Sequence, residues 1–114
     1  HLRSDFHFTL SNTDRVGELI QALHPTPAVC GLPKDEARQF ILANEHHDRR
    51  YYSGFMGPLS LHDTTHLYVT LRCMQLFNSH CRLYAGGGIL PESNEQLEWQ
   101  ETEAKLDTMR RLFQ

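Results

Sequence analysis

The stretch HLYVTLRCMQLF, residues 66–77, limits the possible folds more than any other part of this chain. Its side chains alternate with a period of two, which places the odd positions 67–73 on one face and the even positions 68–74 on the other. This is the period of a β-strand. Asn78 and Ser79 then form a turn, and HCRLYAG, residues 80–86, is expected to return as the antiparallel partner. The second half of the chain is therefore expected to contain a β-hairpin.

Helical patterns lie on both sides of this hairpin. Asn12 or Thr13 can cap a first helix, whose apolar stripe recurs at positions 16, 19, 20 and 23. A second helix is expected over about residues 34–46, with acidic side chains in its first turn. Ser93 can cap a long final helix that continues to about Phe113.

Three further segments complete the outline. Phe6, Phe8 and Leu10 alternate with polar residues, which predicts a half-buried strand over the first ten residues. YYSGFMGPLSL, residues 51–61, has the pattern of a strand with irregularities at its glycines. HPTPAVCGLP, residues 24–33, contains three prolines and a glycine, which exclude a regular element. The order strand, helix, helix, three strands, helix predicts an α+β fold with a largely antiparallel sheet flanked by helices.

Composition narrows the class of protein. A chain of 114 residues suffices for one domain with a modest core. Its net charge of -3, with scattered Lys and Arg, gives no basic surface for nucleic acid, and no apolar run has membrane-spanning length. Three cysteines form neither a CxxC motif nor an even set, so reduced thiols in a cytoplasmic protein are expected. The opening HLRSDFHFTL has neither methionine nor leader, and we expect the chain to be part of a longer protein.

The final helix carries two carboxylates and an ammonium on one border of its apolar stripe. At about 100° per residue, Glu98, Glu101 and Lys105 fall together, away from the solvent arc that contains Glu103. The apolar stripe itself is expected at Leu106, Met109 and Phe113. One interpretation is a surface ion pair worth well under about 1 kcal/mol. The other is a Mg²⁺ site, with the lysine holding a ligand carboxylate.

Two other features can bind anions. YAGGGI, residues 84–89, has three consecutive glycines that permit close backbone approach to a ligand, or form a plain flexible loop. It is neither a GxGxxG nor a Walker A motif. Arg72 is predicted in mid-strand, where it can bind a carboxylate in bidentate fashion or lie at a sheet edge with a buried stem.

Histidine and cysteine give weaker signals. The eight histidines show no transition-metal ligand spacing, so a histidine metal site is not favoured. Cys73 and Cys81 are expected at inward-facing strand positions, as small buried hydrophobic residues.

Together, these motifs resemble the C-terminal part of isochorismate synthases, a family of chorismate-utilising enzymes. The resemblance spans nearly the whole chain and rests on motifs in the family's order and spacing: HLRS, LHPTPAVCGLP, DRRYYSGFMG, VTLRC, LYAGGGI and EWQETEAKLDTM. Anthranilate and aminodeoxychorismate synthases carry a different sequence in place of HPTPAVCG. That string therefore favours isochorismate synthases within the superfamily.

The resemblance implies a fold and a reaction. Residues 1–114 would form the last portion of a single chorismate-binding domain, built from two packed antiparallel sheets with outer helices. The reaction would be the Mg²⁺-dependent, reversible addition of water at C2 of chorismate with loss of the 4-hydroxyl. We expect menaquinone synthesis as its pathway.

The resemblance also implies site residues. Glu101 matches a Mg²⁺ ligand, and Glu98 matches a carboxylate that acts on the metal directly or through water. Other positions match residues that bind the substrate carboxylates or line the chorismate pocket: Arg72, Lys105, Gly86, His1, Ala28 and Tyr84. Many relatives have AGAG where this chain has AGGG.

The family's water-activating lysine, its proton-donating glutamate and a further Mg²⁺-ligating glutamate lie before HLRS. These 114 residues alone are therefore expected to be inactive, and to self-associate through surfaces that the missing part normally covers. Alternative functions are those of a salicylate, anthranilate or aminodeoxychorismate synthase, or of a non-catalytic module that binds a small ligand or a partner.

Overall fold

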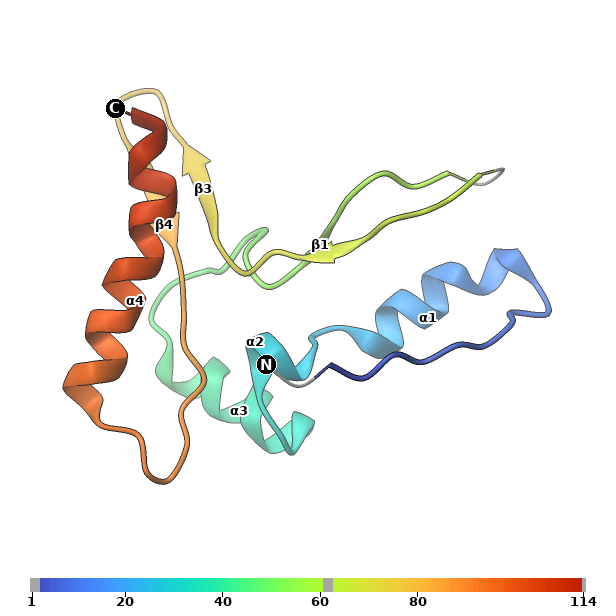
Figure 1. Cartoon of the computed structure of the whole chain (residues 1–114), viewed down its shortest axis with the longest axis horizontal. Helices are drawn as coiled ribbons and strands as arrows, with labels where there is room; N and C mark the ends of the chain where they lie inside the picture. Colours follow the sequence, from blue (N-terminus) through green and yellow to red (C-terminus); the bar gives the residue numbers. More distant parts are fainter. Residues whose placement is uncertain (1–2, 61–62, 114) are drawn as a thin grey trace.

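The computed structural model describes residues 3–60 and 63–113 (Figure 1). Its elements are, in chain order, η1 (Thr13–Arg15), α1 (Val16–Leu23), α2 (Pro27–Cys30), α3 (Lys34–Asn44), β1 (Phe55–Met56), β2 (Tyr68–Val69), β3 (Cys73–Leu76), β4 (Cys81–Tyr84), α4 (Glu95–Arg110) and η2 (Arg111–Phe113). Helices and antiparallel strands are both present, which confirms the α+β class.

The first two predicted helices are confirmed. The Asn12 side chain accepts a hydrogen bond from the Asp14 backbone N–H and so caps η1, which leads into α1. The helix α3 begins after Pro33 and ends at Asn44, two residues earlier than expected. Glu45 follows in an extended conformation, which frees its side chain for the polar contacts described below.

The proline-rich segment contains a short helix, so the prediction of no regular element there was wrong. Pro27 stands at the start of α2, where its missing N–H loses no intrahelical bond and its fixed φ suits a helix. Gly31 ends the helix with φ 103°, a conformation that glycine adopts without strain. Pro27 and Gly31 therefore stand at the two ends of α2, which is one turn long.

The predicted N-terminal strand is absent from residues 3–10 of the structure. Phe6 is 84% exposed and Phe8 is 66% exposed, so neither is half-buried. Alternation decides which side chains share a face, but a strand also needs a neighbour for its backbone hydrogen bonds. No strand in the described part of the chain pairs with this segment.

The predicted long strand over residues 66–77 is divided between two sheets. Its first part is β2, which pairs antiparallel with β1, and its second part is β3, which pairs antiparallel with β4. The β1–β2 pairing continues to Thr70, whose N–H donates to the Gly54 carbonyl at 2.8 Å, and there the chain changes partner. Arg72 consequently lies between β2 and β3, and its predicted mid-strand position was wrong.

The predicted hairpin is present as β3 and β4. Cys73 pairs with Tyr84 at one end of the ladder and Leu76 with Cys81 at the other. The Phe77 N–H donates to the His80 carbonyl at 2.8 Å and closes the expected turn. Cys73 is half-buried, which raises the pKa of its thiol. Cys81 is exposed at the end of the hairpin, so its predicted inward position was wrong.

The final helix α4 lies beside the β3–β4 hairpin (Figure 1). Its N-cap is Asn94, whose side chain accepts a hydrogen bond from the Leu97 N–H at 3.1 Å, so the prediction of Ser93 missed by one residue. Leu106 and Met109 are half-buried as expected, but Phe113, in η2, is 58% exposed. No helix in the described ranges combines the length and apolar character needed to cross a membrane.

Few of the described side chains are buried. Among the described residues, only Tyr84, Ser53 and Thr70 are buried. The radius of gyration is 16.5 Å, against about 13 Å for a compact domain of this length. The accessible surface is 9926 Å², against about 6,400 Å² for a compact monomer of this size. The apolar stripes of the helices and strands are therefore only partly covered within this chain.

Candidate functional site

Charged residues of α4 meet the glycine loop that follows β4. The Lys105 ammonium lies 2.7 Å from Glu101 Oε1 and donates to the Gly86 carbonyl at 3.2 Å. Glu98 lies one turn earlier, with Oε2 3.3 Å from the position that a Cβ on Gly87 would occupy. The structure therefore brings together the α4 residues and the glycines that the sequence singled out separately.

These carboxylates provide the oxygen ligands that Mg²⁺ prefers. In the described ranges, no three or more His, Cys, Asp or Glu side chains are grouped to hold a metal ion. Mg²⁺ usually keeps several waters and takes one or two protein carboxylates, so Glu98 and Glu101 fit as part of such a site. The ion-pair interpretation is also realised, since Glu101 pairs with Lys105.

A hollow of about 770 Å³ adjoins Glu98. The glycine loop and the first turns of α4 line it, with residues that include Gly87, Ile89, Ser93, Trp99 and Thr102. Ser93 Oγ donates to Glu98 Oε1 at 2.6 Å, so the carboxylate is held on the hollow's wall.

Arg72 reaches the same helix from the connection between β2 and β3. Its Nη1 donates to Thr108 Oγ1 at 3.0 Å. Thr108 follows Lys105 by three positions, so it lies on the same side of α4. The Arg72 side chain is exposed, and its guanidinium is available to a ligand beside this face.

Two stacked tyrosines, Tyr52 and Tyr84, lie next to the glycine loop. Tyr84 is 5% exposed, stacks on Tyr52 at 5.7 Å between ring centroids and donates its hydroxyl to Gln75 at 3.2 Å. The Tyr52 hydroxyl lies 2.5 Å from the position of a Cβ on Gly86, so only glycine fits there. Sequence reasoning missed Tyr52, because a glycine indicates close approach without telling which residue approaches.

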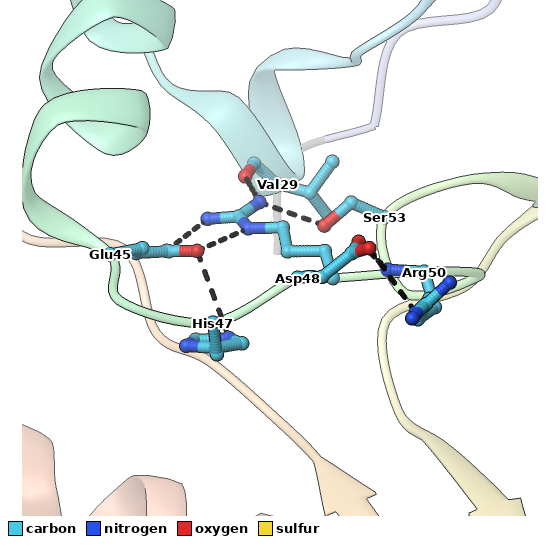
Figure 2. Close-up of polar contacts among 7 residues, drawn as sticks. Val29, Glu45, His47, Asp48, Arg50 and Ser53 are labelled. Atoms are coloured by element: carbon cyan, nitrogen blue, oxygen red, sulfur yellow. Dashed lines mark hydrogen bonds and ion pairs between the residues drawn. The ribbon is translucent and has the colours of Figure 1, made fainter.

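A polar cluster around Arg49 comprises Val29, Glu45, Arg49 and Ser53 (Figure 2). The Arg49 guanidinium donates to both Glu45 oxygens, with Nε–Oε2 at 2.7 Å. Its Nη1 donates to the Val29 carbonyl and to Ser53 Oγ, each at 2.8 Å. The cluster thereby joins α2, the end of α3 and the turn before β1.

Charge and burial set the ionisation of this cluster. The hydrogen bond from Arg49 lowers the pKa of the Glu45 carboxyl, and the same bond raises the pKa of Arg49. Burial raises the pKa of Tyr52, which keeps its phenol neutral. The Arg49 guanidinium carbon lies 5.4 Å from the centroid of the Tyr52 ring, so Tyr52 is held between a cation and Tyr84.

Ala28 and His1 are the two remaining predicted site residues. Ala28 is exposed on α2, next to Val29 of the Arg49 cluster. His1 is outside the described residues.

The family model described as chorismate binding enzyme matches residues 1–114. This chain belongs to the chorismate-binding enzyme family. Isochorismate synthase DhbC of Bacillus subtilis strain 168 is 46% identical over 94 residues, which cover 82% of this chain and 24% of that protein. Isochorismate synthase MenF of Escherichia coli strain K12 is 43% identical over 114 residues, which cover 100% of this chain and 26% of that protein.

A third relative extends the same pattern. Isochorismate synthase EntC of Escherichia coli strain K12 is 37% identical over 113 residues, which cover 99% of this chain and 29% of that protein. No solved structure matches the chain. The chain therefore spans about a quarter of the length of these curated relatives.

Proposed function

We propose that these 114 residues form the C-terminal portion of an isochorismate synthase, which converts chorismate to isochorismate with Mg²⁺. One observation carries the proposal: Lys105 of α4 bridges Glu101 and the Gly86 carbonyl, and Glu98 lies beside Gly87. Carboxylates, an ammonium and a close-lying glycine backbone are the groups that a dicarboxylic substrate and a hard cation require together.

In this proposal, the α4 face is divided between cation and substrate. Glu101 and Glu98 hold Mg²⁺, which when bound supplies a fixed positive charge opposite a substrate carboxylate. Lys105 and Arg72 bind carboxylate groups of chorismate, and the backbone around Gly86 completes the anion site. Ala28, Tyr84 and His1 belong to the proposed pocket lining by family resemblance.

The Lys105 contacts support this division. Its ammonium is partly buried, with 23% of the side chain exposed, and it is held by both Glu101 and the Gly86 carbonyl. A cation on Glu101 would take over part of that carboxylate's charge. The ammonium would then be available to a ligand carboxylate at the mouth of the glycine loop.

The proposal assigns binding and orientation, but not proton transfer, to these residues. By family resemblance, the base and the acid come from before HLRS, outside the 114 residues. The 114-residue chain alone is therefore expected to leave chorismate unconverted and to self-associate. A cytoplasmic location, with the three cysteines present as free thiols, and a role in menaquinone synthesis are parts of the same proposal.

Product analysis of the full-length protein tests this function. Chorismate is incubated with the protein, with and without Mg²⁺ and ammonia, and the products are separated and identified by mass. Mg²⁺-dependent isochorismate formation is the expected result. Salicylate, anthranilate or aminodeoxychorismate would assign one of the related reactions instead, and binding without turnover would indicate a non-catalytic module. Loss of menaquinone from cells lacking the gene is the expected result for the pathway.

A further inference from the structure

The Ser93 hydroxyl occupies a specific place between the glycine loop and α4. It accepts a hydrogen bond from the Leu90 N–H at 3.1 Å and donates one to Glu98 Oε1 at 2.6 Å. The Ser93 backbone N–H also donates to the Leu90 carbonyl at 2.9 Å, which closes the turn. A hydroxyl has a single proton, so accepting from Leu90 directs that proton to the carboxylate.

This bond selects one orientation of the Glu98 side chain. Ser93 engages Oε1, and Oε2 is the oxygen that approaches Gly87, at 3.3 Å from the position of a Cβ there. A free glutamate samples many rotamers, and a ligand that needs one of them must order the side chain. Holding Glu98 in place beforehand removes part of that penalty.

The two carboxylates of the proposed cation site differ in how they are held. Glu101 is 58% exposed at its side chain and pairs with the cationic Lys105. Glu98 is half-buried and is held by a neutral hydroxyl. Lys105 competes with a metal ion for Glu101, whereas Ser93 leaves the charge of Glu98 available to the metal.

We propose that Ser93 is a positioning residue for the cation site, which orients Glu98 so that Oε2 is presented to Mg²⁺ beside the glycine loop. The inference rests on the proposed function, because that function places Mg²⁺ at Glu98. Ser93 itself contacts neither the cation nor chorismate, and it acts through Glu98.

Metal binding by three variants of the full-length protein tests the inference. Mn²⁺ serves as the probe, and electron paramagnetic resonance measures its free concentration. Ser93→Ala is expected to raise the Mn²⁺ dissociation constant about tenfold. Ser93→Thr, which keeps the hydroxyl, is expected to stay within about threefold of the original protein. Ser79→Ala makes the matched change in the β3–β4 turn, where Ser79 Oγ lies 3.3 Å from His80 Nδ1, and should change nothing.

A double-mutant cycle separates positioning from a general effect on folding. In the Glu98→Ala background, Ser93→Ala should weaken Mn²⁺ binding no further, because the carboxylate that it orients is gone. Equal weakening in both backgrounds would overturn the inference, and so would an unchanged dissociation constant in the original background. Circular dichroism checks that each variant is folded. If Ser93→Ala unfolds, Ser93→Cys takes its place, because a thiol has a similar size and is only a weak hydrogen-bond donor.

Kinetics keep this inference distinct from the proposed function. At saturating Mg²⁺, the chorismate KM of Ser93→Ala should stay within about twofold of that of the original protein. The Mg²⁺ concentration that gives half-maximal activity should rise about tenfold. Isochorismate formation combined with unaltered metal binding by Ser93→Ala would overturn the Ser93 inference alone. Tenfold weaker Mn²⁺ binding by Ser93→Ala in a protein that forms no isochorismate would overturn the proposed function and support the inference.

Discussion

At the scale of single residues, two glutamates on α4 have the same chemistry and different surroundings. Glu101 pairs with Lys105 on the face beside the glycine loop. Glu103 instead pairs with Arg110, at 2.8 Å, further along the helix. The expected free solvent arc thus contains an ion pair at Glu103, but it still lies apart from the glycine loop.

Glu101→Gln in the full-length protein is expected to lower the proposed activity by about two orders of magnitude or more, because it removes a formal charge from the proposed cation site. Steady-state kinetics across a Mg²⁺ titration measure the effect. Glu103→Gln makes the same change two positions away and should leave activity nearly unaltered. Similar kinetics for the two variants would contradict the assignment of Glu101 to the metal.

Lys105→Met is expected to raise the KM for chorismate without weakening Mn²⁺ binding, because the proposed partner of the ammonium is a substrate carboxylate and the ammonium competes with the metal for Glu101. Chorismate saturation curves and Mn²⁺ titrations of the same preparation give the two quantities. Weakened Mn²⁺ binding with an unchanged chorismate KM would reverse the roles proposed for Lys105 and Glu101.

Two glycines of the loop, Gly86 and Gly88, should differ in their tolerance of alanine. A Cβ on Gly86 would lie 2.5 Å from the Tyr52 hydroxyl, and Tyr52 cannot easily move because it is stacked on Tyr84. A Cβ on Gly88 would meet no other described residue within 4 Å, its chain neighbours apart. Gly86→Ala is therefore expected to reduce chorismate binding at least about tenfold, and Gly88→Ala to keep activity. Kinetics and thermal unfolding of both variants check this, and equal damage by both would contradict it.

At the scale of secondary-structure elements, Arg49 joins three segments through four hydrogen bonds. Its partners lie in α2, after α3 and in the turn before β1, and its guanidinium covers the ring of Tyr52. Tyr52 in turn touches the glycine loop. The position of the glycine loop therefore depends, through Tyr52, on the contacts that Arg49 makes with elements distant in sequence.

Arg49→Met is expected to lower the free energy of unfolding of the full-length protein by about 2 kcal/mol, because it leaves half-buried acceptors without a donor. Urea titration at neutral pH measures the change. Arg110→Met removes the exposed ion pairs with Glu103 and Asp107 and should have little effect. A larger loss for Arg110→Met would contradict the importance of the cluster.

The Glu45 carboxyl should also make stability depend on pH. Its pKa in the folded protein is lowered from 4.5, so the ionised form stabilises the fold above that pH. This contribution is lost as pH falls through the lower, folded-state pKa. Glu45→Gln should therefore lose less stability than the original protein between neutral pH and pH about 3, as measured by urea titrations across that range. Parallel losses would show that Glu45 is not responsible.

At the scale of the whole molecule, much of the apolar surface has no partner within the described residues. Trp99 and Leu97 of α4 are each 65% exposed, and Phe6 and Phe8 are more than half exposed. The total accessible surface of 9926 Å² also exceeds the roughly 6,400 Å² of a compact monomer, so these side chains stay uncovered within the chain. A surface of this kind matches the proposed status of the chain as part of a larger domain.

The isolated 114-residue chain is expected to self-associate, most simply as a dimer, since burying this apolar surface lowers its free energy. Sedimentation velocity over a range of concentrations measures the association. A single monomeric species at high concentration would contradict the prediction. The full-length protein is the matched control, because its remaining residues are proposed to cover the same surface.

The sequence by itself determined the local elements and the family. The Asn12 cap, the helix starting at Lys34 and the turn at Asn78 and Ser79 depend on hydrogen bonds between residues a few positions apart. The face shared by Glu98, Glu101 and Lys105 likewise depends only on the helical period. Such features depend on short stretches of sequence, so residue patterns and motifs predict them directly.

Only the tertiary structure decided which distant residues meet. The alternation over residues 66–77 predicted one strand, but the change of partner at Thr70 divided it, because strand pairing depends on which neighbour is available. The approach of Tyr52 to Gly86 and the bond from Ser93 to Glu98 required three-dimensional packing. Chain folding selects these contacts from many that local geometry permits, and no short sequence pattern encodes that selection.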